Sequence, residues 1–320
     1  MGKSDTILAV AEEIIKGLQV SEKYISSKFF YDDEGSRIFQ DIMHMPEYYP
    51  TDCEAEIFEM QKEEIGALFC QHCESIDLVE LGAGDGKKTR ILAKEFLNNN
   101  FHFRYIPIDI SKGAIDELVS RMHGEIPEMI IEEKIGDYFD IIEDLSLHYP
   151  NKKVLMFLGS NLGNYNIDQS IDFLSKLNVA MTKNDLLFLG LDLKKDPKII
   201  RDAYDDPHGY TSEFNLNLLR RFNRELGADF NTENFLHAPY YDPKSGVARS
   251  FLVSKTDQKV HFSEIDETIH FRKWETIYTE MSQKYDEKMI RNLAEASGFE
   301  LVENFFDSRD YFVNTLWKKI

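Results

Sequence analysis

Short apolar runs alternate with helical patterns through the middle of the chain. Apolar positions recur at helical spacing in residues 5–18 and 52–70, and from residue 76 the pattern changes. Five apolar runs then follow, each continued by a helical segment; the runs are 76–81, 103–110, 128–135, 153–159 and 185–193, and the helices are 87–97, 112–122, 139–147, 168–181 and 196–204. Because strands that alternate with helices build a parallel sheet covered on both faces, the pattern predicts an α/β fold.

The alternation ends after residue 204. A long helix is predicted over 211–227, and short, mostly antiparallel strands are predicted over 234–280. A helix over 286–297 and the strands FELVENFF and YFVNTLWKK resume the first pattern, and this last hairpin resembles the closing element of a class I methyltransferase sheet. We therefore predict a Rossmann-like methyltransferase domain (61–204 plus 285–320) with an inserted α+β substrate-binding lobe (1–60 plus 205–284).

Composition excludes several classes of partner. The chain of 320 residues has 37 basic and 57 acidic residues, a net charge of −20. So acidic a surface repels phosphate backbones and anionic lipid, and no run approaches the ~18 apolar residues of a membrane span. We therefore expect no nucleic-acid or membrane partner. The N-terminus lacks the pattern of a secretory signal, and three cysteines make neither a disulfide framework nor a zinc site, so we expect no metal and a reducing cytoplasm.

The strongest local signal is VELGAGDGKKT, Val79–Thr89, where a predicted strand turns into a helix. Its three glycines permit positive φ and the close approach of a ligand, and the first N–H groups of the helix favour a carboxylate. The spacing is not the GxGxxG of a dinucleotide site. Glu80 before the loop would repel a pyrophosphate but suits an ammonium or a sulfonium. S-adenosylmethionine carries both cations and a carboxylate, so it fits this loop better than NAD.

Acids at the ends of the next two strands support the same cofactor. Asp109 ends the second predicted strand about 20 residues after the loop, a position from which an acid accepts hydrogen bonds from a ribose diol. Asp137 and Tyr138 end the third predicted strand, where an acceptor and an aromatic face could hold adenine. Three strand ends in the right order therefore predict a site for S-adenosylmethionine.

With these residues assembled, the chain resembles the histidine Nα-methyltransferase family, the first enzymes of ergothioneine biosynthesis. Eight stretches are close to the family's signatures: YDDEGSRIF, PEYYPT, ELGAGDGKKT, FLGSNLGN, LDLKKD, AYDDPHGYTSEFNLNLL, NRELGADF and ETIYTEMSQKY. The matches run from about residue 24 to the C-terminus. The resemblance implies a methyltransferase domain with a second lobe closing over the substrate. It also implies that the enzyme trimethylates the α-amino group of L-histidine to give hercynine.

The resemblance also implies site residues. Those implied for S-adenosylmethionine are Tyr31 and Lys88 at its carboxylate, Gly82 in the loop, Asp109 at the ribose, and Asp137 with Tyr138 at the adenine. Those implied for the substrate are Asn164 and Tyr204 at the carboxylate and amine end, Gly159 at the amine, Phe39 in the pocket wall, and Tyr48, Glu280 and Ser282 at the imidazole. Catalysis is assigned to Asn164, Tyr48 and Tyr204. Because methyl transfer is an in-line displacement by a neutral amine, positioning supplies most of the rate.

One position departs from the family pattern. A family strand like IEMHLVS places a methionine beside the imidazole, whereas this chain reads ARSFLVS, with Ser250 at the aligned position. Two alternatives therefore stay open: N-methylation of another amino acid or of a histidine derivative or aromatic amine, and a non-catalytic regulatory module that binds S-adenosylmethionine. We expect a monomer.

Overall fold

The computed structural model describes residues 3–320, and the chain folds into two compact units. Unit 1 comprises Met1–Tyr49 and Lys195–Ser282, and unit 2 comprises Pro50–Lys194 and Gln283–Ile320. Each unit is therefore built from segments that are far apart in the sequence. Residues 1 and 2 of the predicted substrate lobe lie outside the described part of the chain.

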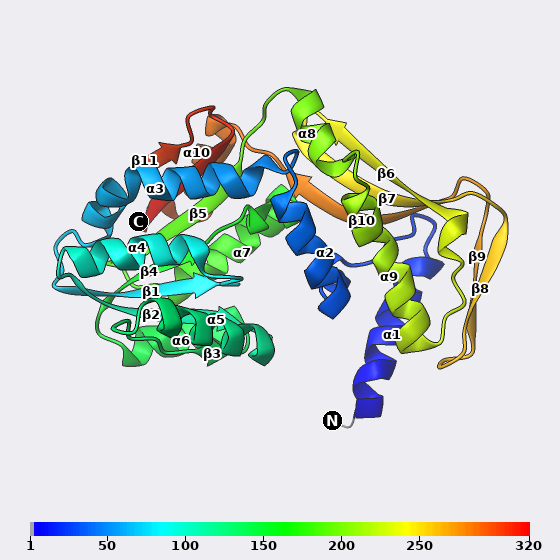
Figure 1. Cartoon of the computed structure of the whole chain (residues 1–320), viewed down its shortest axis with the longest axis horizontal. Coiled ribbons are helices and arrows are strands. Elements are labelled where there is room, and N and C mark those ends of the chain that lie inside the picture. Colours follow the sequence, from blue (N-terminus) through cyan, green and yellow to red (C-terminus); the bar gives the residue numbers. More distant parts are fainter. Residues whose placement is uncertain (1–2) are drawn as a thin grey trace. The chain divides into compact units, whose positions relative to one another are not determined.

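Unit 2 contains a seven-stranded sheet (Figure 1). Its strands, in the spatial order β11-β12-β5-β4-β1-β2-β3, are Phe299–Phe306, Phe312–Lys319, Leu186–Asp192, Lys152–Phe157, Ser75–Leu81, His102–Asp109 and Lys134–Ile135. Strands β1 to β5 are parallel, and β12 pairs antiparallel with both β5 and β11. The predicted α/β sheet and its closing hairpin are confirmed.

Helices cover both faces of this sheet. They are α3 (Tyr49–Phe69), α4 (Lys87–Asn98), α5 (Lys112–Glu125), α6 (Tyr138–His148), α7 (Ile167–Ala180) and α10 (Glu287–Ala296). Along β5, Leu187 and Leu189 belong to the core shared with α6, α7 and α10. Between them Phe188 points to the other face, where its ring lies 5.9 Å from Phe58 and 5.1 Å from Phe69 of α3. Successive residues of one buried strand therefore pack against different helices, which explains its continuous apolar sequence.

The third predicted strand is shorter in the structure. Of 128–135, only Lys134–Ile135 forms β3, although Ile131 makes an isolated parallel bridge with Tyr105. The charged residues before β3 have other partners, since Glu132 forms ion pairs of 2.9 Å with both Arg104 and Lys134. Backbone hydrogen bonds of 2.9 Å still join Tyr105 to Ile130 and Glu132, so the pairing with β2 continues as an isolated bridge before β3.

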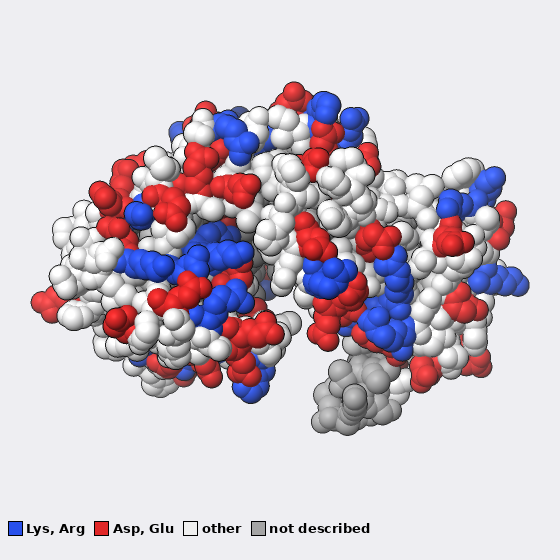
Figure 2. Space-filling model, viewed as in Figure 1, with Lys and Arg blue, Asp and Glu red and all other residues white. Residues whose placement is uncertain are grey.

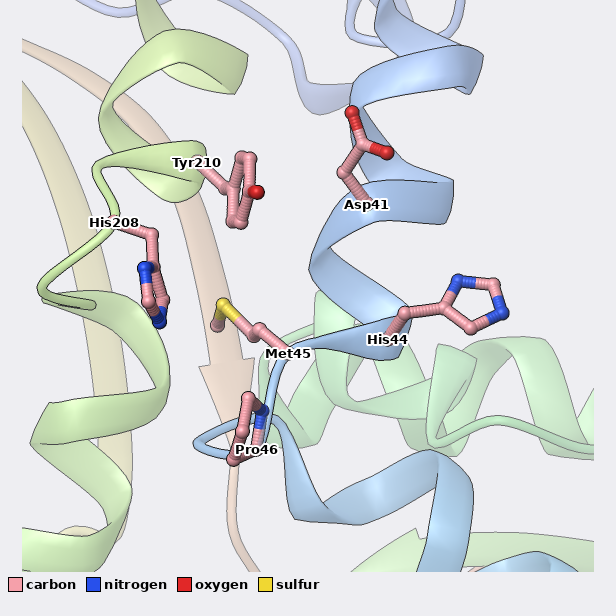
Figure 3. Close-up of a pocket in the computed structure, with 6 residues that line it drawn as sticks. All are labelled: Asp41, His44, Met45, Pro46, His208 and Tyr210. Atoms are coloured by element: carbon pink, nitrogen blue, oxygen red, sulfur yellow. The ribbon is translucent and has the colours of Figure 1, made fainter.

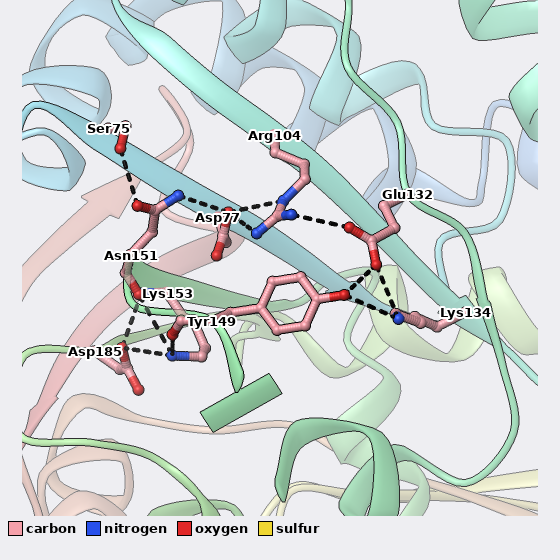
Figure 4. A network of polar contacts seen from close by, with 9 residues as sticks. All are labelled: Ser75, Asp77, Arg104, Glu132, Lys134, Tyr149, Asn151, Lys153 and Asp185. Atoms are coloured by element: carbon pink, nitrogen blue, oxygen red, sulfur yellow. Dashed lines mark hydrogen bonds and ion pairs between the residues drawn. The ribbon is translucent and has the colours of Figure 1, made fainter. Parts of the chain in front are cut away.

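A polar network lies where β1, β2 and β4 begin, the opposite end of these strands from the glycine loop (Figure 4). Arg104 donates hydrogen bonds of 3.0 and 2.9 Å to fully buried Asp77 and one of 2.9 Å to Glu132. Asn151 donates to the same Asp77 oxygen at 3.2 Å. The network therefore links the starts of neighbouring strands through one buried carboxylate.

Unit 1 contains helices packed against two small sheets. Its helices are α1 (Lys3–Gln19), α2 (Asp33–His44), α8 (Pro197–Tyr204) and α9 (Tyr210–Leu226), and its strands are β6 (Phe235–Asp242), β7 (Val247–Ser254), β8 (Gln258–Phe262), β9 (Glu267–Phe271) and β10 (Thr276–Gln283). The sheets have the orders β10-β7-β6 and β8-β9. Apolar residues of α1, α2, α9 and the strands form one core. The α+β character of the inserted lobe is confirmed.

Helix α2 was not predicted from apolar spacing. Its N-cap is Asp32, whose Oδ1 accepts a hydrogen bond of 2.7 Å from the backbone of Gly35 and one of 2.8 Å from Asn217 of α9. One carboxylate thus begins α2 and joins it to α9.

Charge is mixed on the face drawn in Figure 2, where acidic side chains are spread over both units. Basic side chains gather over α4, whose sequence contains Lys87, Lys88, Arg90 and Lys94. The first turn of α4 follows the glycine loop, so this concentration of positive charge lies next to the predicted cofactor residues.

Candidate active site

The glycine loop joins β1 to α4 as predicted. Gly82 and Gly86 have φ of 67° and 65°, the left-handed region that favours glycine. A Cβ on Gly86 would lie 2.5 Å from Leu118, and one on Gly82 would lie 3.2 Å from the hydroxyl of Tyr138. The loop therefore needs glycine for both backbone conformation and space, and it places Gly82 beside Tyr138.

Glu80, the last but one residue of β1, is 3% exposed. Thr89 Oγ1 and Tyr105 Oη each donate a hydrogen bond of 2.6 Å to its carboxylate. Burial is the main reason that the pKa of Glu80 is raised to about 7, while the two hydroxyls and Lys88 act in the opposite direction. A bound cation would favour the ionised form of this carboxyl, so Glu80 fits the ammonium or sulfonium of S-adenosylmethionine.

Asp109, Asp137 and Tyr138 lie at the carboxyl edge of the sheet. Asp109 ends β2, and Asp137 caps α6 by accepting a hydrogen bond of 2.9 Å from the backbone of Phe139. Burial, followed by the charge of Asp109, raises the pKa of Tyr138 to about 12. This interaction shows that Asp109 lies close to Tyr138. Unit 2 therefore brings together four predicted cofactor residues, Gly82, Asp109, Asp137 and Tyr138.

Lys88 and Gly159 both donate hydrogen bonds to the carboxylate of Glu54, which is not among the predicted site residues. Lys88 Nζ lies 2.5 Å from Oε2 of Glu54, and the backbone N–H of Gly159 donates to the same oxygen at 2.9 Å. Burial tends to lower the pKa of Lys88, but Glu54 outweighs it and the pKa is raised. Asn164 is exposed at the end of the 3₁₀ helix Asn161–Asn164, which follows this turn.

The signal for Glu54 was present in the sequence. It precedes Ile57 and Phe58 by three and four residues, so it falls within the buried stripe of α3 that includes these two residues. An acid in such a stripe has a buried partner in most proteins.

The predicted residues of unit 1 cluster around aromatic rings. Tyr31 lies 5.5 Å from Phe39, and Phe39 lies 6.1 Å from Tyr48, measured between ring centroids. The pKa of Tyr31 is raised, first by desolvation and then by the nearby Glu280 and Tyr204. Tyr31 as a whole is 50% exposed, so solvent screens part of this effect. Unit 1 therefore brings five of the predicted residues into one neighbourhood.

Strand β10 carries Glu280 and Ser282, two of the residues predicted to contact the imidazole. Ser282 follows Glu280 by two residues, so both side chains point to the same face of the strand, and Ser282 is 8% exposed. Ser250 lies on the neighbouring strand β7, where Thr279 Oγ1 donates a hydrogen bond of 3.0 Å to its carbonyl. Ser250 is 1% exposed, and its own hydroxyl has no hydrogen-bond partner among the residues that the structure describes.

Unit 1 also contains a pocket of about 260 Å³, lined by Asp41, His44, Met45, Pro46, His208 and Tyr210 (Figure 3). The rings of His208 and Tyr210 lie 5.7 Å apart, and the Met45 side chain points toward them, whereas His44 points away (Figure 3). None of the residues predicted from the sequence lines this pocket.

Neither a metal cluster nor a membrane-spanning helix occurs in residues 3–320. No group of three or more His, Cys, Asp or Glu side chains in this part of the chain could hold a metal ion. No helix there is long and apolar enough to cross a bilayer.

Comparison with known proteins identifies the family. The family described as histidine-specific methyltransferase, SAM-dependent, matches residues 10–319. The chain belongs to this family. Membership makes it an enzyme that uses S-adenosylmethionine, which confirms the predicted fold class, reaction class and cofactor.

Curated relatives are similar in sequence to this protein over most of its length. A histidine N-alpha-methyltransferase of Mycobacterium tuberculosis is 31% identical over 98% of this chain and 95% of its own length. A histidine N-alpha-methyltransferase of Mycolicibacterium smegmatis is 34% identical over 90% of this chain and 88% of its own length. Ergothioneine biosynthesis protein 1 of Schizosaccharomyces pombe is 23% identical over 88% of this chain and 37% of its own length. The predicted resemblance is confirmed.

Proposed function

We propose that this enzyme transfers three methyl groups in succession to the α-amino group of L-histidine, giving the trimethyl betaine hercynine. The observation that carries the proposal is the family match over residues 10–319. It is supported by two curated relatives that bear the name histidine N-alpha-methyltransferase and are 31% and 34% identical.

The cofactor is assigned mainly to residues of unit 2. Gly82 leaves room for it, Asp109 accepts from the ribose diol, and Asp137 with Tyr138 holds the adenine. Lys88 pairs with the carboxylate, and the Tyr31 hydroxyl donates a hydrogen bond to it. The positive-φ loop, the helix N-terminus behind it and buried Glu80 support this assignment, because they suit a ligand with a carboxylate and two cationic groups.

The substrate is assigned to a second set of residues. Asn164 and Tyr204 hold the carboxylate and amine end, and Gly159 lies against the amine. Phe39 lines the wall, and Tyr48, Glu280 and Ser282 recognise the imidazole. The neighbourhood of Tyr31, Tyr204 and Glu280 in unit 1 supports this assignment, because it joins an acid to phenols that can donate. A neutral imidazole has one donor and one acceptor nitrogen, and a Glu and a Tyr complement these.

The chain's own residues contribute mostly by positioning. S-adenosylmethionine, when bound, supplies a methyl group on a sulfonium, and an in-line attack requires the amine to be neutral and aligned. A water-poor pocket lowers the pKa of an ammonium, so Asn164 and Tyr204 need only hold the amine in line. The departing proton can leave through Tyr48 or Tyr204 to solvent.

Rates of methyl transfer to separate amines test the proposal. Histidine should be methylated, whereas histamine, which lacks the carboxylate, and phenylalanine, which lacks the imidazole, should react far more slowly. Equal rates with phenylalanine would support the alternative that another amino acid is the substrate. Tight binding of S-adenosylhomocysteine without turnover of any amine would support the regulatory module.

The surroundings of the enzyme belong to the same proposal. We propose a monomer acting on a small molecule in the cytoplasm. The three cysteines, Cys53, Cys70 and Cys73, are all free thiols, which agrees with a reducing compartment.

A further inference from the structure

Glu54 is a fully buried carboxylate in α3 that receives hydrogen bonds from three different elements of unit 2. Lys88 of α4 donates to Oε2 at 2.5 Å, and the backbone of Gly159, after β4, donates to Oε2 at 2.9 Å. Asn314 of β12 donates to Oε1 at 3.0 Å. Both oxygens therefore have donors, and one of these donors is a cation, as a buried carboxylate requires.

The sheet makes space for this carboxylate. A Cβ on Gly190 of β5 would lie 2.1 Å from Glu54 Oε1, so any larger residue there would displace the carboxylate. Gly190 has an ordinary strand conformation, since it is absent from the residues with positive φ. Space for Glu54, rather than backbone freedom, explains this glycine.

The turn that Glu54 holds is strained. Gly159 and Ser160 both have left-handed φ, 72° and 58°, which is uncommon for a serine. The Ser160 hydroxyl accepts a hydrogen bond of 3.1 Å from the backbone of Asp192, and Glu54 accepts from the backbone of Gly159. Both residues of the turn are therefore held by hydrogen bonds, and the 3₁₀ helix that ends at Asn164 begins immediately after it.

We propose that Glu54 is a positioning residue that couples the cofactor contact of Lys88 to the amine contact of the Gly159 turn. The inference rests on the proposed function, which assigns Lys88 to the cofactor carboxylate and Gly159 with Asn164 to the substrate amine. One carboxylate fixes the ammonium of Lys88 and the strained turn together. Displacing it releases both groups at once.

A double-mutant cycle in the full-length enzyme tests the coupling. Glu54→Gln keeps the size of the side chain but removes its charge, and Lys88→Met removes the cation. Each single change should weaken S-adenosylhomocysteine binding, measured by calorimetry, by about tenfold, and the double variant should be no weaker than the weaker single variant. Glu54→Gln should also lower kcat/KM for the amine more than Lys88→Met does, because it releases the Gly159 turn as well.

Two further variants separate positioning from stability. Gly190→Ala displaces the Glu54 carboxylate while keeping its charge, so it should reproduce the loss of kcat/KM. Glu59→Gln is the control, because Glu59 lies on the same helix and its carboxylate forms an exposed ion pair of 3.4 Å with Lys62. This change should alter neither binding nor rate.

The coupling is overturned if the two single effects on binding add in the double variant. It is also overturned if Glu54→Gln lowers Tm while binding and kcat/KM stay within about twofold of wild type, as a purely structural residue would do. The binding cycle needs no turnover, so it remains informative even if histidine proves not to be the substrate. A Lys88→Met variant that binds normally would contradict both the Lys88 assignment and the coupling.

Discussion

Two buried serines on β7 differ in what their hydroxyls contact. Ser254 Oγ donates a hydrogen bond of 2.8 Å to the carbonyl of Thr256 and accepts one of 2.6 Å from Gln258. Ser250 Oγ is buried without a partner in the described part of the chain. Removing a satisfied buried hydroxyl costs about 1–2 kcal/mol, whereas removing an unsatisfied one relieves a desolvation penalty. Ser250→Ala should therefore leave the free energy of unfolding unchanged or raise it, and Ser254→Ala should lower it. Urea denaturation of both variants measures these free energies of unfolding. An equal loss of stability in the two variants would show that the Ser250 hydroxyl has a hydrogen-bond partner.

The acid of β10 tests the recognition of the imidazole. Glu280→Ala should lower kcat/KM for histidine by about 10–100-fold, the scale of one lost contact to a charged acceptor, and should relax discrimination against phenylalanine. Tyr48→Phe should weaken the binding of histidine and have little effect on the binding of the cofactor. The rates of methylation of histidine and phenylalanine, measured in one competition assay, give this discrimination. An unchanged preference in Glu280→Ala would remove the imidazole assignment.

At the scale of the element, the β1–α4 junction should make stability depend on pH. The folded pKa of Glu80, about 7, exceeds its ordinary value of 4.5. Below pH 4.5 the carboxyl of Glu80 is protonated in both the folded and the unfolded chain. Between pH 4.5 and 7 it is protonated mainly in the folded chain, so the free energy of unfolding falls as pH rises. Glu80→Gln should match wild type below pH 4 and exceed its free energy of unfolding by about 3 kcal/mol at pH 8, because the difference between 4.5 and about 7 is worth 1.36 kcal/mol per pKa unit.

The same change should weaken cofactor binding, because it removes the charge that faces a cation. Exposed Glu133→Gln is the control and should follow the wild-type stability curve. Parallel stability curves for wild type and Glu80→Gln would contradict the buried, protonated state of Glu80.

Regular periodicity predicted most elements, and the exceptions have local causes. The runs that became β1, β2, β4 and β5 are continuously apolar because both faces are covered. Helix α2 was missed although its sequence carries local signals, the N-cap Asp32 and the buried residues Ile38 and Ile42 one turn apart. Strand β3 is short as a regular strand, but an isolated bridge at Ile131 continues its pairing with β2.

At the scale of the whole molecule, the Arg104 network should contribute to stability without affecting the site. Arg104→Met leaves fully buried Asp77 without its cation, a change that costs on the order of 3 kcal/mol. Asp77→Leu combined with Arg104→Met should recover much of this loss. Because the network lies at the opposite strand ends from the glycine loop, affinity for S-adenosylhomocysteine should stay unchanged. Lys112→Met, which breaks an exposed pair with Asp116, should change the free energy of unfolding far less than Arg104→Met does.

The proximity of the residues predicted for the cofactor has a physical reason. Parallel strands end at one edge of the sheet, so strand order makes Gly82, Asp109 and Tyr138 neighbours. The residues of unit 1 came from family resemblance alone, since nothing in local spacing brings Tyr31 near Glu280. The position of Glu54 within an apolar stripe was visible in the sequence, but its partners were not, because they lie far away along the chain.

The identity of the methylated product shows whether the enzyme methylates the α-amino group of histidine. The purified enzyme is incubated with L-histidine and excess S-adenosylmethionine, and the products are fragmented by tandem mass spectrometry. We predict mono-, di- and trimethyl species that appear in succession, with every methyl group on the α-nitrogen and the trimethyl species accumulating. Methyl groups on the imidazole, or no methylated histidine while another amine in the same assay is methylated, would contradict it.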